Sequence, residues 1–182
     1  MSNLWQRAIT GAIFVAVIVG AIIFKSWIFH LVFGLVALVG LNEFYGLFKA
    51  SKTSPHQTLG VLFGALIYIS GIAALYTPEA IKYLLGFSFF SFSVIALAEL
   101  YRKKKTPFEN IGVTLLGLVY LIVPFLLLNY TIDFNKNTFT ITDFWPVLTI
   151  FILVWCSDTF AYLVGRKIGK NKLFERISPK KS

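Results

Sequence analysis

The chain has 182 residues, of which 57% are hydrophobic and 14% are charged, and its formal net charge is +9. A soluble domain averages about 25% charged residues, so this composition excludes a soluble globular protein. The single cysteine, Cys156, excludes an intramolecular disulfide and a CxxC metal site. His30 and His56 lack acidic neighbours at metal-ligand spacing, and we expect both in interfacial or loop positions. The composition indicates one integral membrane domain over residues 1–182, with no nucleic-acid partner.

Six apolar segments have the length of membrane spans, each of which needs about 20 mostly apolar residues. They lie near residues 4–24, 27–48, 59–76, 80–100, 111–130 and 144–165. Because only Lys25 and Ser26 separate the first two segments, these should form a tight hairpin. The sequence therefore predicts an all-α, polytopic helical membrane bundle with about six transmembrane helices.

Basic residues are concentrated in alternate connections between these segments. Lys25, Lys82 and Lys136 fall on one side of the membrane. The rest of the 17 basic residues fall on the side of the N-terminus: Arg7, Lys49, Lys52, Arg102, Lys103, Lys104, Lys105, Arg166, Lys167, Lys170, Lys172, Arg176, Lys180 and Lys181. Cytoplasmic loops of membrane proteins carry an excess of Lys and Arg. We therefore predict a cytoplasmic N-terminus and a cytoplasmic basic tail over residues 166–182.

Prolines give a second set of expectations. Ser54-Pro55 and Thr77-Pro78 each precede a predicted span, where Ser or Thr suits the N-cap and Pro the first helical position. The pair recurs at Ser178-Pro179 with only three residues after it, so we expect the chain to be the N-terminal portion of a longer protein. Pro124, inside the fifth predicted span, either opens that helix or is an ordinary tolerated membrane proline.

Three carboxylates, Glu43, Glu99 and Asp158, lie within the predicted cytoplasmic ends of spans. A carboxylate inside a membrane helix is costly to insert and is usually functional. Glu43 fits either a functional group or a hydrogen bond between helices, and Glu99 fits a charge partner for the Arg102–Lys105 run. Topology and attraction to anionic lipids are enough to explain that basic run.

Asp158 has the strongest functional signature of the three. Small residues recur beside it every four positions, a spacing that lets another helix approach closely. They are Ser157, Ala161, Gly165 and Gly169. We therefore expect Asp158 to face protein or a polar cavity, with an interhelical ion pair as the structural alternative. The same stripe permits a homodimer.

The residues after Gly165 form a basic segment that ends in Ser178-Pro179-Lys180-Lys181. A helix N-terminus with nearby lysines suits phosphate oxygens. This pattern indicates a nucleotide or a phospholipid phosphate as a candidate ligand.

The segment Trp155–Lys172, WCSDTFAYLVGRKIGKNK, with ISPKKS at Ile177–Ser182, resembles the central region of the phosphatidate cytidylyltransferases, also called CDP-diacylglycerol synthases. The family pattern is close to W-x-x-D-x-x-A-Y-x-x-G-+-x-x-G-+, followed by S-P-K-K-[ST]. Arg7 before the first span and Glu43-Phe44-Tyr45 at the end of the second also resemble that family.

The resemblance implies a nucleotidyltransferase of phospholipid biosynthesis that converts CTP and phosphatidic acid to CDP-diacylglycerol and pyrophosphate. It also implies Mg²⁺ as cofactor, membrane lipids as surroundings, and a bacterial inner membrane location with a cytoplasmic active site. Asp158 would be the catalytic and metal-binding carboxylate. The implied substrate contacts are Ser157, Arg166, Lys170, Lys172, Ser178, Lys180 and Lys181.

Part of the family pattern is missing from this sequence, namely a Lys-Arg pair, a His-Gly-Gly element and closely spaced aspartates. We expect these elements, with the main metal ligands, downstream of Ser182, and expect this portion to be inactive alone. The alternative functions are a membrane transporter or ion-relay subunit that uses Glu43 and Asp158, and a noncatalytic membrane scaffold.

Overall fold

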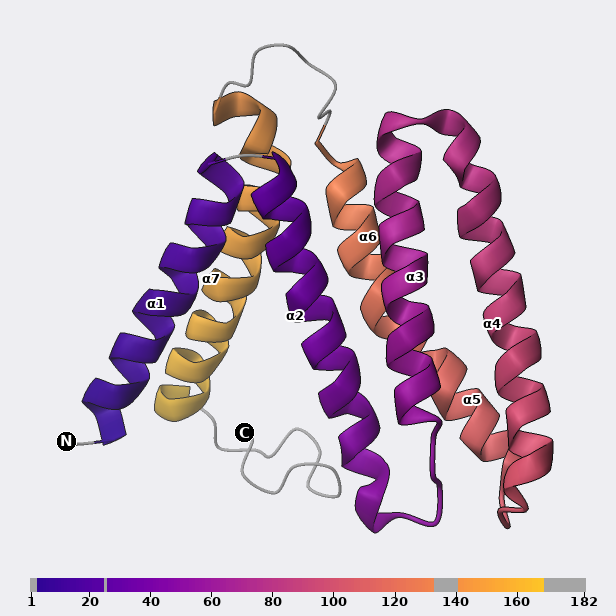
Figure 1. The fold of residues 1–182 in the computed structure, drawn as a ribbon. Coiled ribbons are helices and arrows are strands. Elements are labelled where there is room, and N and C mark those ends of the chain that lie inside the picture. Colours follow the sequence, from indigo (N-terminus) through magenta and orange to yellow (C-terminus); the bar gives the residue numbers. More distant parts are fainter. Residues whose placement is uncertain (1–2, 25, 133–140, 169–182) are drawn as a thin grey trace.

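The computed structural model describes residues 3–24, 26–132 and 141–168, which form helices joined by short connections (Figure 1). No strand occurs among these described residues, so the all-α prediction is confirmed. The main helices are α1 (Asn3–Phe24), α2 (Ser26–Gly46), α3 (Gln57–Tyr76), α4 (Ile81–Arg102), α5 (Pro107–Gly117), α6 (Val123–Tyr130) and α7 (Trp145–Ile168). Short 3₁₀ turns lie at Leu47–Ala50 (η1), Pro78–Ala80 (η2) and Ile141–Phe144 (η4), and a π-helical turn lies at Leu118–Ile122 (η3).

Helix length and hydropathy confirm a polytopic membrane bundle. Five segments are long and apolar enough to cross a membrane: Trp27–Gly46, Gln57–Tyr76, Pro78–Arg102, Pro107–Tyr130 and Trp145–Gly165. They correspond to the second to sixth predicted spans. The first predicted span coincides with α1, in which a shorter apolar run, Ile9–Ile22, is described. A total of six spans therefore stays a prediction.

Consecutive helices run up and down, so alternate connections lie at the same end of the bundle (Figure 1). The α2–α3 and α4–α5 connections share one end with the start of α1 and the end of α7. We call it the basic end, defined by Lys52 and by Arg102–Lys105 in those two connections. The arrangement agrees with the predicted alternation of basic connections.

The main apolar core joins α2, α3, α4, η3 and α6, and Tyr45 is its largest fully buried side chain. The Tyr45 ring fits because two glycines face it: a Cβ at Gly60 or Gly117 would lie 2.5 Å from ring atoms. The Tyr45 hydroxyl donates a hydrogen bond to the Thr114 carbonyl oxygen at 2.7 Å. Because Gly60 and Gly117 have no side chains, the Tyr45 ring packs directly on their backbones and holds α2 against α3 and α5.

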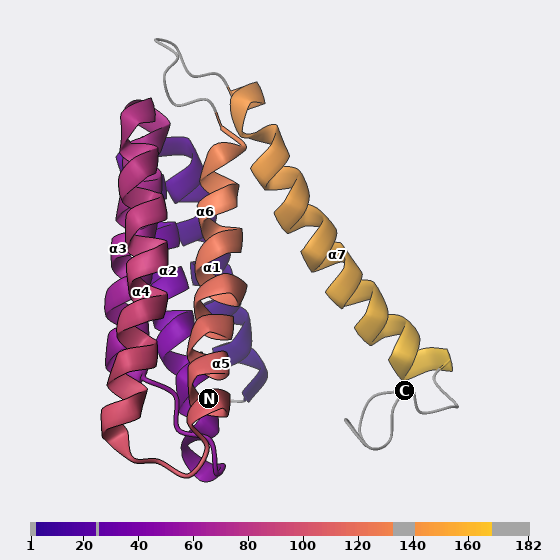
Figure 2. The same cartoon turned by 90° about the vertical axis from the view of Figure 1, so that its right-hand side faces the viewer.

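A second apolar cluster joins α1 and α2 to the start of α7. It contains Ile22, Phe29, Phe33, Phe144 and Val147. Beyond this cluster α7 diverges from the other helices, as Figure 2 shows. Among the described residues, few therefore lie against the later part of α7.

A buried polar cluster ties α2, α3 and α6 together near the opposite end. His30 Nδ1 lies 2.6 Å from the Asn129 side-chain oxygen, and His30 Nε2 lies 2.7 Å from the Tyr76 hydroxyl. Tyr68 donates to the His30 carbonyl oxygen and accepts from the Asn129 amide. These polar groups satisfy one another, as buried polar groups must. His30 is therefore a buried interhelical link in α2 and does not lie in a loop.

Pro124 opens its helix, one of the two outcomes expected from the sequence. Proline cannot donate the backbone hydrogen bond that an α-helix requires at its position. The chain is π-helical over Leu118–Ile122 and returns to α-helix at Val123, with Pro124 in the first turn of α6. The fifth predicted span is thus three successive helical pieces.

The predicted cap at Ser54-Pro55 is wrong, because α3 begins at Gln57 with His56 at the N-cap. Ser54 is engaged elsewhere: its backbone N–H donates to the Asn110 side chain at 2.6 Å, and its carbonyl and hydroxyl oxygens accept from Arg102 at 2.8 Å. Thr77-Pro78 does begin a helical turn, η2, although the Thr77 hydroxyl makes no cap hydrogen bond.

Glu99 is the centre of a buried polar network at the basic end. Its side chain is 0% exposed, and it accepts hydrogen bonds from Asn110 at 2.5 Å and from Arg102 at 3.1 Å. His56 Nε2 lies 2.7 Å from the same carboxylate. Glu99 is thus a charge partner of Arg102, as expected, although it is buried. The network joins the end of α4 to the start of α5 and, through Ser54, to the α2–α3 connection.

Replacing Glu99 should destabilise this end of the bundle. Glu99→Gln removes the charge and one acceptor, so Arg102 or Asn110 loses a bond. We expect the free energy of unfolding in detergent to fall by about 1.5–3 kcal/mol, the range for a hydrogen bond to a charged group. Glu79→Gln, which changes an exposed carboxylate in η2, is the matched control. It should change the free energy of unfolding by less than about 0.5 kcal/mol. Equal stability of both variants would contradict a structural role for Glu99.

His56 should make stability depend on pH. Burial, and then the Arg102 guanidinium, lower the pKa of His56 below its usual 6.5, and outweigh the opposing effect of Glu99. Above about pH 6.5 the imidazole is neutral in both the folded and the unfolded chain, so protonation of His56 does not lower the free energy of unfolding there. As the pH falls, the unfolded chain takes up the proton first, and the free energy of unfolding falls by up to about 1.4 kcal/mol per pH unit.

Chemical denaturation between pH 7.5 and 5 measures this slope. His56→Gln should flatten the slope relative to the unchanged chain. An identical slope in the two proteins would mean that His56 does not titrate differently in the folded state.

Candidate functional site

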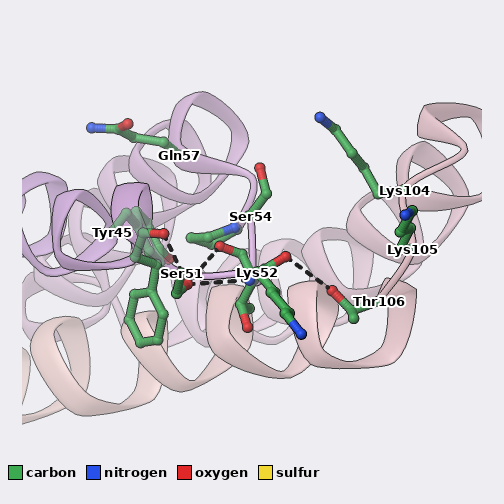
Figure 3. A pocket seen from close by; sticks show the side chains of 11 residues that line it. Tyr45, Ser51, Lys52, Ser54, Gln57, Lys104, Lys105 and Thr106 are labelled. Atoms are coloured by element: carbon green, nitrogen blue, oxygen red, sulfur yellow. Dashed lines mark hydrogen bonds between the residues drawn. The ribbon is translucent and has the colours of Figure 1, made fainter.

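A pocket of about 570 Å³ lies at the basic end, between the α2–α3 and α4–α5 connections (Figure 3). Three groups of residues line it: the end of α2 and η1, the connection to α3, and the turn between α4 and α5. These residues are Tyr45, Phe48, Ser51, Lys52, Thr53, Ser54, Pro55, Gln57, Lys104, Lys105 and Thr106. The two connections are more than forty positions apart in the printed sequence, so only the fold brings them together.

The chemistry of the lining suits an anion. Lys52 is contributed by one connection, and Lys104 and Lys105 lie across from it on the other (Figure 3). Ser51, Thr53, Ser54 and Thr106 add hydroxyl groups to the lining. No Asp or Glu is among the lining residues that the structure describes. Ammonium groups are donors that phosphate oxygens accept from.

Hydrogen bonds hold the two connections in place. Ser51 Oγ donates to the Phe48 carbonyl oxygen at 2.9 Å and accepts from the Thr53 backbone N–H at 3.1 Å. Thr106 Oγ1 donates to the Lys52 carbonyl oxygen at 3.4 Å, which joins one connection directly to the other. Lys103, with φ of 51°, turns the chain out of α4 in the left-handed conformation.

The Glu99 network supports one wall of this pocket. Ser54 belongs both to the lining and to the network, through its hydrogen bonds with Arg102 and Asn110. The next residues are fixed as well, because the His56 backbone N–H donates to Thr114 Oγ1 at 2.9 Å. The Glu99 carboxylate is paired with Arg102 and is fully buried, whereas the exposed Glu109 carboxylate accepts from Thr53 Oγ1 at 3.2 Å at the edge of the lining.

The residues singled out in the sequence motif are placed differently. Asp158 and Ser157 lie on α7 and are exposed within the single chain, as is Ala161 of the small-residue stripe. The expectation that Asp158 faces protein or a polar cavity therefore stays a prediction. Among the described residues, the part of α7 that packs is its first half, where Val147 and Phe151 lie against the cluster of α1 and α2.

Most of the expected phosphate contacts cannot be placed. Arg166 lies in α7, but its side chain is outside the described residues. Five further positions lie wholly outside them: Lys170, Lys172, Ser178, Lys180 and Lys181.

The described residues supply no complete metal site. No group of three or more His, Cys, Asp or Glu side chains lies together within the part of the chain that the structure describes. Asp158 could contribute one carboxylate oxygen. Glu43 is exposed on α2, and no contact between it and Asp158 is present among the described residues. Within the described residues, the geometry thus offers neither a metal cluster nor the ion relay weighed as an alternative.

The pocket was not predicted from the sequence. The Arg102–Lys105 run was explained by topology alone, and Lys52 was only one of the cytoplasmic charges. The available signal was that two basic connections are predicted at the same end of the bundle. Adjacent hairpins could have been expected to bring Lys52 and Lys104 close together.

Comparison of the sequence with known proteins agrees with the resemblance found in the motif. Residues 5–182 match the cytidylyltransferase family model. The phosphatidate cytidylyltransferase of Synechocystis sp. is 24% identical over 97% of this chain and 65% of its own length. That of Haemophilus influenzae is 28% identical with the same coverage of both chains, and that of Aquifex aeolicus is 53% identical over 36 residues.

The chain spans 65% of the length of the Synechocystis and Haemophilus relatives. No solved structure matches it. Since the family model covers nearly every residue, from 5 to 182, the chain belongs to the cytidylyltransferase family.

Proposed function

We propose that this chain acts in cytidylyl transfer to phosphatidate, in which CTP and phosphatidate give CDP-diacylglycerol and pyrophosphate. The observation that carries the proposal is the family match over residues 5–182. The matched relatives named phosphatidate cytidylyltransferase, and the membrane-spanning helices suited to a lipid substrate, support it.

The proposed reaction brings two polyanions together at a membrane surface. A phosphate oxygen of phosphatidate attacks the α-phosphorus of CTP and forms a new P–O bond. The bond between the α-phosphorus and the oxygen bridging to the β-phosphate breaks, and pyrophosphate leaves with the bonding electron pair. Cationic groups must offset the crowded negative charge, which is the main demand of phosphoryl-type transfer.

In this proposal the residues of the motif contact the substrates. Asp158 is the carboxylate of the reacting site, and Ser157 and Arg166 are contacts from the same helix. Lys170, Lys172, Lys180 and Lys181 bind phosphate oxygens, and Ser178 caps a helix near the nucleotide. The support is the motif pattern that runs from Trp155 to Ser182.

Mg²⁺ is the proposed cofactor. When bound it would supply Lewis-acid charge for the leaving pyrophosphate. The described residues offer it Asp158 alone, without a group of three ligands, so no step is assigned to the metal.

We further propose that the basic end faces the cytoplasm of a bacterial cell, in the inner membrane. The support is the excess of Lys and Arg in the connections at that end. CTP, a cytoplasmic nucleotide, is then available on the side of the membrane where α7 ends and the basic tail begins. A homodimer is proposed as well, since Ser157 and Ala161 leave a small-residue surface exposed on α7.

An assay of membranes from cells that express the complete gene containing this chain tests the proposal. Sealed inside-out vesicles should convert CTP and phosphatidate to CDP-diacylglycerol and pyrophosphate, and right-side-out vesicles should not. Asp158→Asn should lower turnover by about 10- to 100-fold, the range for removing a group that supports a metal or reacting centre. Glu79→Gln, an exposed carboxylate at the opposite end, should retain full turnover.

Three outcomes contradict parts of the proposal. Absence of CDP-diacylglycerol in both kinds of vesicle would refute cytidylyl transfer. Activity confined to right-side-out vesicles would reverse the orientation. Full turnover in the Asp158→Asn variant would reduce Asp158 to a structural residue.

A further inference from the structure

The span made of α5, η3 and α6 is fixed to its neighbours by a buried asparagine near each end (Figure 2). Near its start, the Asn110 amide donates to Glu99 at 2.5 Å. Near its end, the Asn129 amide donates to the Tyr68 hydroxyl at 3.0 Å, and the Asn129 side-chain oxygen lies 2.6 Å from His30 Nδ1. Both asparagines are 0% exposed, so both must keep their partners.

The buried face of this span shifts by one position at the π-helical turn. Before the turn it contains Asn110, Thr114 and Gly117, spaced by four and three positions as on one face of an α-helix. In an unbroken α-helix the same face would continue at Leu121, Phe125 and Leu128. The residues that are buried are instead Ile122, Leu126 and Asn129. Each lies one position later, so the turn contains one residue more than the α-helical repeat requires.

Both halves of the span face α3. In the first half, Thr114 Oγ1 accepts from the backbone N–H of His56, the N-cap of α3, at 2.9 Å. In the second half, Leu126 packs so closely on α3 that a Cβ at Gly71 would lie 2.5 Å from its side chain. An α-helix turns by about 100° per residue. If the whole span were α-helical, Leu126 and Asn129 would therefore point about 100° away from the face that carries Thr114.

Pro124 explains why the additional residue is accommodated at this place. In an α-helix its ring would clash with the carbonyl group of Tyr120, four positions earlier, and it has no N–H to donate to that carbonyl. The π-helical turn, Leu118–Ile122, contains Tyr120. Val119 and Tyr120 are 61% and 66% exposed, so the turn widens on the side away from the core.

We propose that the π-helical turn is a register device. It adds one residue to the span, so that both halves bind α3 and both buried asparagines reach their partners. One span thereby links the Glu99 network at the basic end to the His30 cluster at the opposite end. Conversion of the turn to α-helix would rotate α6 by about 100° relative to α5 and withdraw Asn129 from His30 and Tyr68.

Two single-residue deletions test the proposal in the complete protein, purified in a mild detergent. Deletion of Val119 together with Pro124→Ala removes the additional residue, and the span can then be one α-helix with a single buried face. We expect the melting temperature to change by less than about 4 °C. Leu62 is 53% exposed in α3, which is α-helical throughout. Its deletion should lower the melting temperature by more than about 8 °C, because the residues beyond it rotate out of the core.

Equal losses in the two deletion variants would overturn the proposal, because the span would then have no residue to spare. Insertion of one alanine after Val119 changes the register in the opposite direction. It should lower the melting temperature as much as the deletion of Leu62 does. An insertion tolerated as well as the deletion of Val119 would also overturn the proposal, since the turn would then be indifferent to register.

Asn129→Ala shows whether the second asparagine stays in place. It removes the hydrogen bonds with His30 and Tyr68 and should lower the melting temperature of the unchanged protein by at least about 3 °C. The shift should agree within about 2 °C in the protein that lacks Val119. No shift in that protein would mean that Asn129 no longer reaches its partners and would overturn the proposal. None of these measurements uses CTP or phosphatidate, so they do not depend on cytidylyl transfer.

Discussion

A buried carboxylate at the end of α4 organises the basic end of this protein. Glu99 is withdrawn from solvent, and an unpaired charge in that position would be strongly destabilising. Arg102 and Asn110 supply the compensating donors, and Arg102 also binds the α2–α3 connection at Ser54. One charge therefore determines how two connections lie against each other. The lysine-lined pocket exists because those connections are held apart and in register.

Apolar length was enough to predict the helices, and proline chemistry gave the opening at Pro124 as one of two outcomes. The pairing of Glu99 with Arg102 was also within reach, because the two are three positions apart on one helix. The partners of Ser54 were not, since Arg102 and Asn110 are distant in sequence and outcompete the local cap expected there. The pocket was missed for the same reason. A basic run has a sufficient explanation in topology, and only tertiary packing places Lys52 across from it.

Asp158 illustrates the opposite case, in which a sequence pattern is more informative than the packing of the described residues. The motif after Trp155 identified the family, and the match over residues 5–182 confirmed it. Within the described chain, however, α7 packs in its first half, between Val147 and Phe151, and Asp158 is exposed. A motif can be identified in a helix even where the residues that pack against it are not described. The geometry of the site cannot, so the roles proposed for Asp158 and Arg166 rest on the motif.

The central claim is that Glu99 sets the spacing of the two connections around the pocket. Pulsed electron paramagnetic resonance measures it directly, with spin labels on Lys52→Cys and Lys105→Cys in a Cys156→Ser background. We expect a narrow distance distribution when Glu99 is present and a broadened, shifted one in the Glu99→Gln variant. Identical narrow distributions in both proteins would contradict it, because the connections would then keep their spacing without the buried charge.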